Sequence, residues 1–215
     1  MAWFAQEPRV TEWLAVDDDA LRGRVLALLP ADRPALILVD GRSGSGKSTL
    51  AARLAAVLDA GVVHTDDIAW QHHPTDWADL LVAGILEPWR SGDGGSFRPP
   101  RWVAKNRPGA IEVPTTRILI AEGVGAGRTE LAASADLVVW VQADPEEARR
   151  RGILRDMDLG RTRAQAEDFW EEWGRFEDPF LAADRPWTRA HLIIDGTARG
   201  ADGDTRLAIG PISAD

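Results

Sequence analysis

A glycine-rich stretch in the first quarter of the chain constrains the fold most strongly. It reads Gly41-Arg42-Ser43-Gly44-Ser45-Gly46-Lys47-Ser48-Thr49 and fits the pattern G-x-x-x-x-G-K-[ST]. The apolar run Leu36–Val39 precedes it directly, and the helical run Leu50–Leu58 follows it. A strand, a loop and a helix in this order are the context in which this pattern binds phosphate. A chance glycine- and serine-rich turn before a helix is the alternative.

The residue types of this loop suit phosphate groups. Glycine lets backbone N–H groups turn inward where a Cβ would clash, and the helix N-terminus adds partial positive charge. Lys47 is one of only two lysines in a chain with 25 Lys and Arg, and it can reach the β- and γ-phosphates. The Ser48 hydroxyl can bind Mg²⁺. The residues expected to bind ATP here are Gly41, Ser43, Gly44, Ser45, Gly46, Lys47, Ser48 and Thr49.

Composition narrows the class of protein. A chain of 215 residues can form one α/β domain, which we expect over 1–215, with an N-terminal helical segment (1–33), a substrate-side segment (70–113) and a lid (149–163). The net charge of −9 argues against a nucleic-acid-binding face. The chain contains no cysteine, which excludes disulfides and thiolate metal sites. Without a signal peptide or a long apolar run, we expect a cytoplasmic protein with no membrane partner. The sequence leaves a homo-oligomer open.

Two early segments are expected to be structural. Trp13-Leu14 and Leu21–Leu29 predict one or two short helices that pack against the sheet without chemistry of their own, capped by Asp17-Asp18-Asp19. At the end of the helix after the glycine-rich loop, Gly61 is predicted to form the C-terminal cap.

Two carboxylates follow the next predicted strand, Val62–Thr65. They are Asp66 and Asp67. Ligands of open parallel sheets lie beyond the carboxyl ends of the strands, so both are expected to face the phosphate-binding loop. One could accept a proton from a substrate hydroxyl, and the other could orient water on Mg²⁺. The alternative is that they cap the next helix.

Residues 70–113 are expected to lie on the substrate side. Asp76 is predicted to cap a helix through Leu86 that Pro88 ends. His72 and His73 are interpreted as a surface loop, because adjacent histidines diverge on a regular element. The stretch Phe97–Pro108 either binds an anionic or aromatic substrate or is a solvated loop; its basic and aromatic residues are Arg98, Arg101, Trp102, Lys105 and Arg107.

A second acidic position follows the apolar strand 117–121. Glu122 stands where a Walker B carboxylate would hold a water on Mg²⁺. A further strand, Leu137–Val141, leads to a helix that begins near Asp144-Pro145. Residues 190–197 predict a last strand and a turn, in which Gly196 could approach an adenine.

The helix after Pro145 is rich in arginine. From 149 to 163 the chain has six Arg against two Asp, a local charge of +4. A mobile arginine-rich lid over ATP would stabilise the charge of a phosphoryl group in transfer. The alternative is a basic helix end that complements the helix dipole. A second helix, 164–175, is predicted to turn Phe169, Trp170 and Trp173 inward.

The order of these pieces, over about residues 35–197, resembles the uridine kinase, phosphoribulokinase and pantothenate kinase branch of the P-loop kinases. Asp66-Asp67-Ile68 resembles the branch's D-[SDG]-F segment, whose first Asp is the catalytic base. Glu122-Gly123 resembles its E-G pair. The resemblance implies a three-layer α/β/α P-loop fold with a central parallel sheet and an arginine-rich lid.

The lid carries the most specific match. Residues 151–156, Arg-Gly-Ile-Leu-Arg-Asp, followed by Gly160-Arg161, are similar to the R-R-x-x-R-D…R-G-R lid of uridine kinases. This implies that Arg155 and Arg161 contact phosphate and that Arg151 supports them. His73–Leu81 is similar to the H-P-D-A-F-D segment, where an Asp holds a ribose hydroxyl. Its spacing is one residue short here, so Asp76 and Asp79 are both candidates.

Three departures from the branch stand out. Ile68-Ala69-Trp70 replaces its aromatic pair after the base, and Gly152 replaces an arginine. The base-reading histidine of uridine kinases has no clear counterpart, and the nearest position falls around Lys105.

The sequence thus predicts transfer of the ATP γ-phosphate to a hydroxyl of a small molecule, with a nucleoside favoured. Lys47, Asp66, Arg155 and Arg161 are the expected catalytic residues. Ser48, Asp66 and Glu122 are expected around Mg²⁺; Arg151 and Gly196 near the nucleotide; and Asp66, Asp67, Asp76, Asp79 and Trp102 near the acceptor. A nucleoside monophosphate kinase that clamps its acceptor with the arginines of 98–107, and an ATP-binding regulatory protein without an acceptor, are the alternatives.

Overall fold

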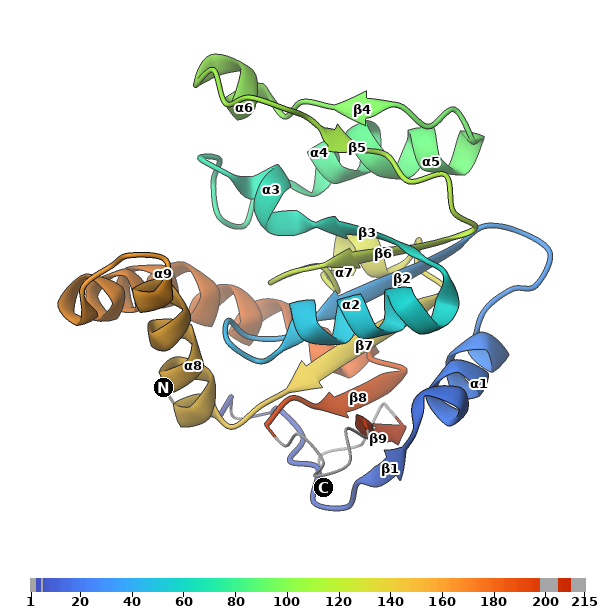
Figure 1. Ribbon diagram of the computed structural model, residues 1–215. Coiled ribbons are helices and arrows are strands. Elements are labelled where there is room, and N and C mark those ends of the chain that lie inside the picture. Colours follow the sequence, from blue (N-terminus) through green and yellow to red (C-terminus); the bar gives the residue numbers. More distant parts are fainter. Residues whose placement is uncertain (1–2, 5, 198–204, 210–215) are drawn as a thin grey trace.

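The computed structural model describes residues 3–4, 6–197 and 205–209 (Figure 1). The strands are β1 (Leu14–Val16), β2 (Ala35–Asp40), β3 (Gly61–His64), β4 (Ser96–Phe97), β5 (Ile111–Glu112), β6 (Ile118–Glu122), β7 (Leu137–Gln142), β8 (Leu192–Asp195) and β9 (Thr205–Ile209). The helices are α1 (Asp18–Leu28), α2 (Lys47–Leu58), α3 (Thr65–Ala69), α4 (Ala78–Leu81), the π-helix η1 (Val82–Leu86), α5 (Glu87–Ser91), α6 (Pro100–Ala104), α7 (Thr129–Ala132), α8 (Pro145–Asp158), α9 (Arg163–Asp184) and the 3₁₀ helix η2 (Pro186–Arg189).

A seven-stranded sheet forms the centre of the fold, with strand order β1-β9-β8-β7-β2-β6-β3. The five strands from β8 to β3 are mutually parallel, and β9 and β1 are added antiparallel at one edge. All six residues of β2 are buried. Because helices cover both faces of this strand, it is a nearly continuous apolar run and does not alternate with polar residues. The predicted α/β fold with a mostly parallel central sheet is confirmed.

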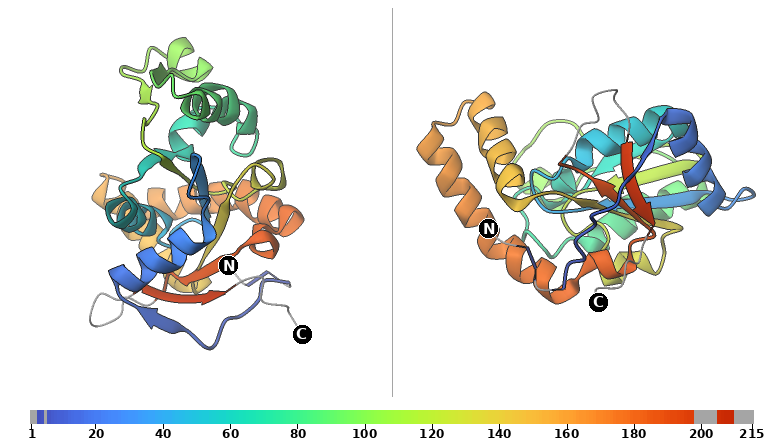
Figure 2. Two further views of the ribbon diagram at one scale, coloured as in Figure 1. Left: turned by 90° about the vertical axis from the view of Figure 1, so that its right-hand side faces the viewer. Right: turned by 90° about the horizontal axis from the view of Figure 1, so that it is seen from below.

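Successive residues of β2 belong to two cores on opposite faces of the sheet. Ile37 and Val39 pack in one core with α1 and α2, whereas Leu36 and Leu38 pack in the other with residues 63–138. A third cluster joins β7 and β8 to the C-terminal part of α9 and to η2. The sheet is therefore the middle layer of a three-layer arrangement (Figures 1 and 2).

Two parts of the chain extend beyond these layers. The segment from α3 to β5 stands above the β3 edge of the sheet in Figure 1. Helices α8 and α9 pack on each other, and Figure 2 shows them projecting from the body of the protein. Because α8 begins three residues after β7 ends, this helical pair rises from the carboxyl ends of the strands.

The N-terminal segment differs from the prediction. The residues around Trp13-Leu14 do not form a helix: Leu14 begins β1, which pairs with β9, a strand that the sequence did not indicate. Hydrogen bonds to a strand almost 200 residues away override the local helical preference. The cap was predicted correctly, because Asp17 accepts a hydrogen bond from the Ala20 N–H at 2.8 Å. The tail that follows Thr197 lies outside the described residues except for 205–209.

Three predicted helix boundaries are wrong. Asp59, at φ 52°, forms the C-terminal cap of α2, and Gly61 instead begins β3. A Cβ at Gly61 would lie 2.3 Å from the Pro114 side chain, so close packing and not a turn requires this glycine. Asp76 does not cap α4, which starts after Trp77. Pro88 does not end the helix, because α4, η1 and α5 follow one another without a break as far as Ser91.

Helix α9 is much longer than the predicted 164–175. It runs to Asp184 and contains Pro179, and a capping box formed by Thr162 and Gln165 begins it. A proline removes one hydrogen bond within a helix and favours a kink, so packing of both ends must hold this helix together.

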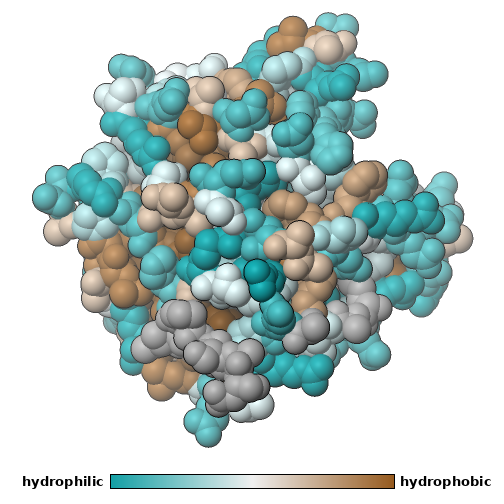
Figure 3. Space-filling view, turned by 180° about the vertical axis from the view of Figure 1, so that it is seen from behind, coloured by the Kyte–Doolittle hydropathy of each residue, from teal (hydrophilic) through white to brown (hydrophobic). Residues whose placement is uncertain are grey.

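The face opposite to that of Figure 1 carries hydrophilic side chains with apolar patches between them (Figure 3). Within the residues that the structure describes, no helix is long and apolar enough to cross a membrane.

Candidate active site

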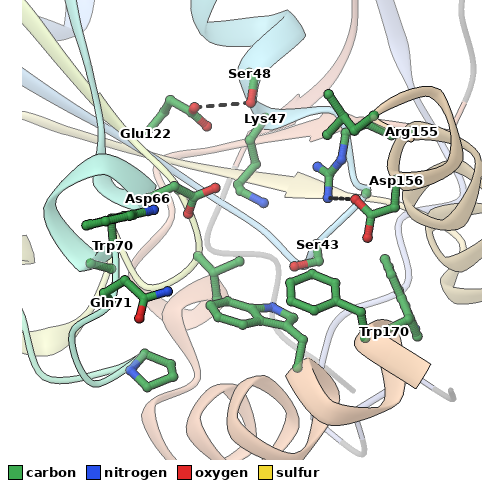
Figure 4. A pocket seen from close by; sticks show the side chains of 18 of the residues that line it. Ser43, Lys47, Ser48, Asp66, Trp70, Gln71, Glu122, Arg155, Asp156 and Trp170 are labelled. Carbon is green, nitrogen blue, oxygen red and sulfur yellow. Dashed lines mark hydrogen bonds and ion pairs between the residues drawn. The ribbon is translucent and has the colours of Figure 1, made fainter. Parts of the chain in front are cut away.

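A cavity of about 620 Å³ opens beside the glycine-rich loop. Its wall comes from this loop, the end of β6, the turn after α3, and the facing sides of α8 and α9 (Figure 4). Elements that are far apart in the sequence thus meet at the carboxyl ends of the parallel strands, as expected for an α/β protein.

The glycine-rich loop has the backbone of an anion cradle. Gly44 and Gly46 have φ values of 73° and 101°, which residues with a Cβ rarely adopt. A Cβ at Gly44 would also lie 2.1 Å from the Ala148 carbonyl oxygen of α8. Lys47 begins α2 and donates to the Arg42 carbonyl at 3.0 Å. Ser43, Gly44, Lys47 and Ser48 line the cavity, while Gly41, Ser45, Gly46 and Thr49 complete the loop and the first turn of α2.

Glu122 lies at the end of β6 and faces the start of α2. Its Oε1 accepts a hydrogen bond from the Ser48 hydroxyl at 3.1 Å and lies 2.5 Å from Nδ1 of His64. Burial alone would raise the pKa of Glu122, but the hydrogen bond to His64 and the charge of Lys47 outweigh it, so the pKa lies below its ordinary value. An ionised carboxylate beside a hydroxyl is a suitable oxygen pair for Mg²⁺.

His64 is a neighbour of Glu122 that sequence reasoning missed. The two residues are directly paired in the β3–β6 register. The hydrogen bond to Glu122 raises the pKa of His64. The sequence shows a polar residue at the end of each of these strands, which was the available signal. It does not show that β3 pairs with β6, and only this pairing brings His64 and Glu122 together. Among the described residues, no group of three or more His, Asp or Glu side chains is arranged so that it could bind a metal ion by itself.

The two aspartates after β3 diverge. Both lie in the first turn of α3, with His64 at the N-cap position. Asp66 lines the cavity with Lys47 and Glu122 (Figure 4), whereas Asp67 is bound by Arg107 at 2.8 Å and does not line it. Desolvation by the surrounding protein raises the pKa of Asp66, opposed by the charge of Lys47 and reinforced by that of Glu122.

Two of the predicted lid arginines reach the cavity. Arg155 and Arg161 line it from α8 and the α8–α9 turn, and the buried carboxylate of Asp156 lies 3.6 Å from the first and 3.4 Å from the second. The Arg161 guanidinium also lies over the Phe169 ring, 4.2 Å from its centroid. One buried acid therefore holds two cations at the cavity wall.

Arg151 faces elsewhere. It bonds to Glu147 and to the carbonyl oxygens of Gly196 and Thr197, so it ties α8 to the turn after β8. Gly196 packs on the glycine-rich loop, where a Cβ would lie 2.0 Å from the Ser45 carbonyl oxygen. Neither Arg151 nor Gly196 lines the cavity.

Three predicted acceptor residues also lie outside the cavity wall: Asp76, Asp79 and Trp102. Both aspartates are exposed. The Trp102 ring is covered by the Arg107 guanidinium at 3.6 Å, and its N–H donates to the Asp67 carbonyl. Their assignment to an acceptor stays a prediction from sequence.

Two buried carboxylates contact the glycine-rich loop from outside the cavity. Asp40 ends β2 and accepts hydrogen bonds from the N–H groups of Gly41, Gly125 and Gly127, and burial raises its pKa to about 6. Glu177 of α9 accepts a hydrogen bond from the Ser43 N–H at 2.6 Å. Sequence reasoning missed both, and the position of Asp40 directly before the loop was the available signal for the first.

The N-terminal segment reaches the same loop. Arg42 is 2 % exposed, and its guanidinium pairs with Glu7 at 3.1 Å. Glu7 also accepts a hydrogen bond from the Trp140 indole at 3.1 Å. This segment was expected to pack against the sheet without chemistry of its own; it also contacts the loop, because Glu7 holds the second loop residue from behind.

The sheet topology and the glycine-rich loop together define the class: the chain has a three-layer α/β fold with a P-loop, which matches the fold of solved P-loop kinases. A structure from Silicibacter sp. TM1040, whose assignment as a fructose transport system kinase is itself provisional, is 23% identical and has a TM-score of 0.51, covering 79% of this chain and 93% of its own. A structure from Bacillus stearothermophilus, with a provisional uridine kinase assignment, is 21% identical with the same TM-score and covers 82% of this chain and 96% of its own. No family model matches the sequence, and no curated protein matches it significantly.

Proposed function

We propose that this protein transfers the γ-phosphate of ATP to a hydroxyl group of a small molecule, with a nucleoside as the favoured acceptor class. The observation that carries the proposal is the shared cavity. Asp66 lines it with the residues expected to hold the phosphates, Lys47 and Ser48, and with Arg155 from the lid side. A base, a phosphate cradle and a movable cation around one space are the parts that phosphoryl transfer to an alcohol needs.

The loop and α2 would hold the nucleotide. Backbone N–H groups around Gly44 and Gly46 and the N-terminus of α2 provide donors and partial positive charge for phosphate oxygens. Lys47 adds a full charge. Ser48 and Glu122 would hold Mg²⁺ or its water, and a bound Mg²⁺ would offset the negative charge of the phosphates.

Asp66 would act on the acceptor. Its carboxylate accepts the hydroxyl proton while the acceptor oxygen forms a bond to the γ-phosphorus and the bond from that phosphorus to the β,γ-bridging oxygen breaks, so that ADP leaves. A raised pKa makes a carboxylate a stronger base, which suits this role. Arg155 would contribute positive charge where the transferred group carries its negative charge.

The cavity favours a hydroxyl acceptor over a phosphorylated one. The basic residues of 98–107 do not line it, and Arg107 is held between Asp67 and the rings of Trp70 and Trp102. A nucleoside monophosphate kinase would need such a clamp to face the acceptor.

The test is the variant Asp66→Asn, with Asp168→Asn on the exposed side of α9 as the matched control. ADP release is measured with Mg²⁺ across nucleosides, nucleotides, pantothenate and sugars, and ATP affinity by calorimetry. We expect Asp66→Asn to lower kcat by about 10²–10⁴-fold, the usual contribution of a positioned base, with ATP affinity nearly unchanged. Full turnover of this variant would remove Asp66 from the role of base. A wild-type protein that binds ATP but phosphorylates no hydroxyl compound would instead be a nucleotide-binding protein.

A further inference from the structure

The wall of the cavity has a charged part and an aromatic part. Its acidic and basic residues gather around the P-loop and the two lid arginines, whereas the remaining wall is aromatic or apolar apart from Gln71 and His72, whose Nδ1 is buried without a hydrogen-bond partner. In Figure 4, Trp70 and Gln71 lie at the left and Trp170 at the lower right, while Ser48 and Glu122 lie at the top of the view. An acceptor whose hydroxyl reaches Asp66 would therefore extend along the aromatic side.

Helix α9 supplies most of that aromatic surface. Phe169, Trp170 and Trp173 all line the cavity, and Trp70 lines it from the turn after α3. Rings of this kind offer flat apolar faces on which other flat rings can stack. The Arg161 guanidinium lies on Phe169 and is paired with Asp156, a carboxylate that it shares with Arg155.

Two donors on this surface have no partner. The indole nitrogens of Trp170 and Trp173 are shielded from solvent and form no hydrogen bond. By contrast, Trp77, Trp89 and Trp102 donate their N–H groups to backbone carbonyls. A shielded donor without an acceptor is unfavourable, and two such donors three residues apart on one cavity wall indicate a missing partner. The indole N–H of Trp187 is also buried without a hydrogen-bond partner, but Trp187 lies in the core beside Trp140.

The packing of Trp170 fixes which edge of its ring is available. The edge formed by Cε3 and Cζ3 faces α8, where a Cβ at Gly152 would lie 1.9 Å from Cζ3. The N–H lies on the opposite edge of the indole. Both nitrogens are covered in this structure, so a hydrogen bond from either to a ligand would require its ring to turn.

Gln71 adds a polar group that can both donate and accept. It lines the cavity with φ at 56°, a left-handed conformation that is uncommon outside glycine.

We propose that the phosphoryl acceptor is an uncharged, planar ring compound that carries its hydroxyl on an arm and presents carbonyl or ring-nitrogen acceptors at its edge. Its ring lies against the aromatic side of the cavity, and the indole N–H groups of Trp170 and Trp173 bind its edge, so that the lid helix α9 selects the acceptor. This inference rests on the proposed kinase function, because it places the hydroxyl at Asp66.

The experiment uses three groups of hydroxyl compounds on the full chain. Pyrimidine and purine nucleosides and hydroxymethylpyridines have planar rings with edge acceptors; benzyl alcohol has a ring without them; ribose and fructose have no planar ring. Binding is measured by calorimetry and transfer by ADP release. We expect the first group to bind best.

Trp170→Phe and Trp173→Phe keep a ring but lose the N–H, so we expect each to raise KM for this group by about tenfold with little change in kcat, as for loss of one buried hydrogen bond. Trp13→Phe, outside the cavity, is the matched control and should change neither constant.

The outcomes separate this inference from the proposed function. Transfer to ribose or fructose without binding of any planar ring compound would leave the kinase function standing and overturn the inference. Binding of ring compounds that weakens in Trp173→Phe, without phosphoryl transfer, would support the site and overturn the kinase function. An equal loss of affinity in Trp173→Phe for nucleosides and for benzyl alcohol would show that stacking alone binds the ring, and would overturn the role of the N–H groups.

Discussion

At the scale of single residues, the site depends on two carboxylates whose surroundings act in opposite directions. The pKa of Glu122 is lowered, since hydrogen bonds from His64 and Ser48 hold its charged form, whereas desolvation raises the pKa of Asp66. Two acids with separated pKa values in one cavity can take two roles, one as a metal-binding anion and one as a base.

The raised pKa of Asp66 predicts the acid limb of the pH–rate profile. A base works only when deprotonated, so kcat/KM should fall as pH drops through the pKa of Asp66, at a higher pH than an ordinary aspartate would give. The charge of Arg155 lowers this pKa, so Arg155→Met should move the limb to still higher pH, whatever its effect on kcat. Profiles of kcat/KM against pH for the two proteins, with the exposed Arg163→Met as control, measure this. A limb that stays in place in Arg155→Met would contradict it.

Asp40 gives a prediction about stability. Its Oδ1 accepts from Gly41 and Gly125, and its Oδ2 accepts from Gly127 at 2.9 Å. Asp40→Asn places an NH₂ group against one of these N–H donors, whichever way the amide turns. We expect a loss of about 1–3 kcal/mol in the free energy of unfolding, the cost of a buried donor without an acceptor. Urea unfolding measures it, and Asp79→Asn at an exposed position is the control. Equal stability of the two variants would mean that these hydrogen bonds contribute little.

At the scale of elements, the lid is a helical pair with its own small core. Ile153 of α8 packs with Ala166 and Trp170 of α9, and Gly152 gives the Trp170 ring room. The glycine that departs from the uridine kinase pattern therefore has a packing reason here: a side chain at 152 would exclude the tryptophan.

Gly152→Ala tests this contact. The new Cβ would overlap the Trp170 ring, so we expect a loss of about 1–3 kcal/mol from overpacking and a higher KM for the acceptor as the ring shifts. Gly23→Ala in α1 is the control, since nothing lies within 4 Å of its added Cβ and alanine favours a helix by about 0.5–1 kcal/mol. Thermal unfolding of both variants should shift in opposite directions. A stabilised Gly152→Ala would show that the helices adjust freely.

Helix α9 also contacts the P-loop directly. Glu177 is 1 % exposed and accepts the Ser43 N–H on the face away from the cavity. The helix that presents the aromatic wall is thus anchored on the loop expected to hold phosphate, and Pro179 follows two residues later. A single element connects the two halves of the site.

Glu177→Leu should weaken this anchor. It leaves the Ser43 N–H without an acceptor, which we expect to cost about 1–3 kcal/mol of stability and to weaken ATP binding measured by calorimetry. Glu177→Gln retains an acceptor oxygen, so this variant should keep most of the wild-type stability and most of the wild-type ATP affinity. If the leucine and glutamine variants bind ATP equally, the anchor does not position the loop.

At the scale of the whole molecule, the N-terminal segment packs against the P-loop and the residues around it. Phe4 stacks on Trp187 at 5.3 Å, Val10 donates to Gln142, and Glu7 pairs with Arg42. Further along, β1 pairs with β9 at the sheet edge. Segments from both ends of the described chain thus stabilise the core that carries the site.

Glu7→Gln tests the buried pair at this junction. It leaves the Arg42 guanidinium charged and without its anionic partner, so we expect a loss of about 3–5 kcal/mol in the free energy of unfolding. Glu12→Gln, at an exposed position of the same segment, should stay close to wild type. Urea unfolding of the two variants decides this, and a wild-type stability for Glu7→Gln would mean that Arg42 finds another partner or water.

The sequence by itself determined the features that depend on local order. The P-loop, the strand before it, the acid at the end of β6 and the arginine-rich helix after β7 were all predicted, because each is written in a short run of residues with a characteristic spacing. The α/β class followed from their alternation along the chain. The position after a strand indicated Asp66, and the resemblance to uridine kinases indicated Arg155 and Arg161; all three line one cavity in the structure.

Only the tertiary structure decided which of the other polar residues meet. Asp66 and Asp67 are adjacent in sequence, yet one faces the cavity and the other binds Arg107. His64 meets Glu122 through strand pairing, and Glu7 meets Arg42 across 35 residues. Such contacts arise when burial of apolar surface fixes the elements in space, and the buried charges then take whichever partners lie within reach. No short run of residues encodes that proximity, so no local pattern could have shown it.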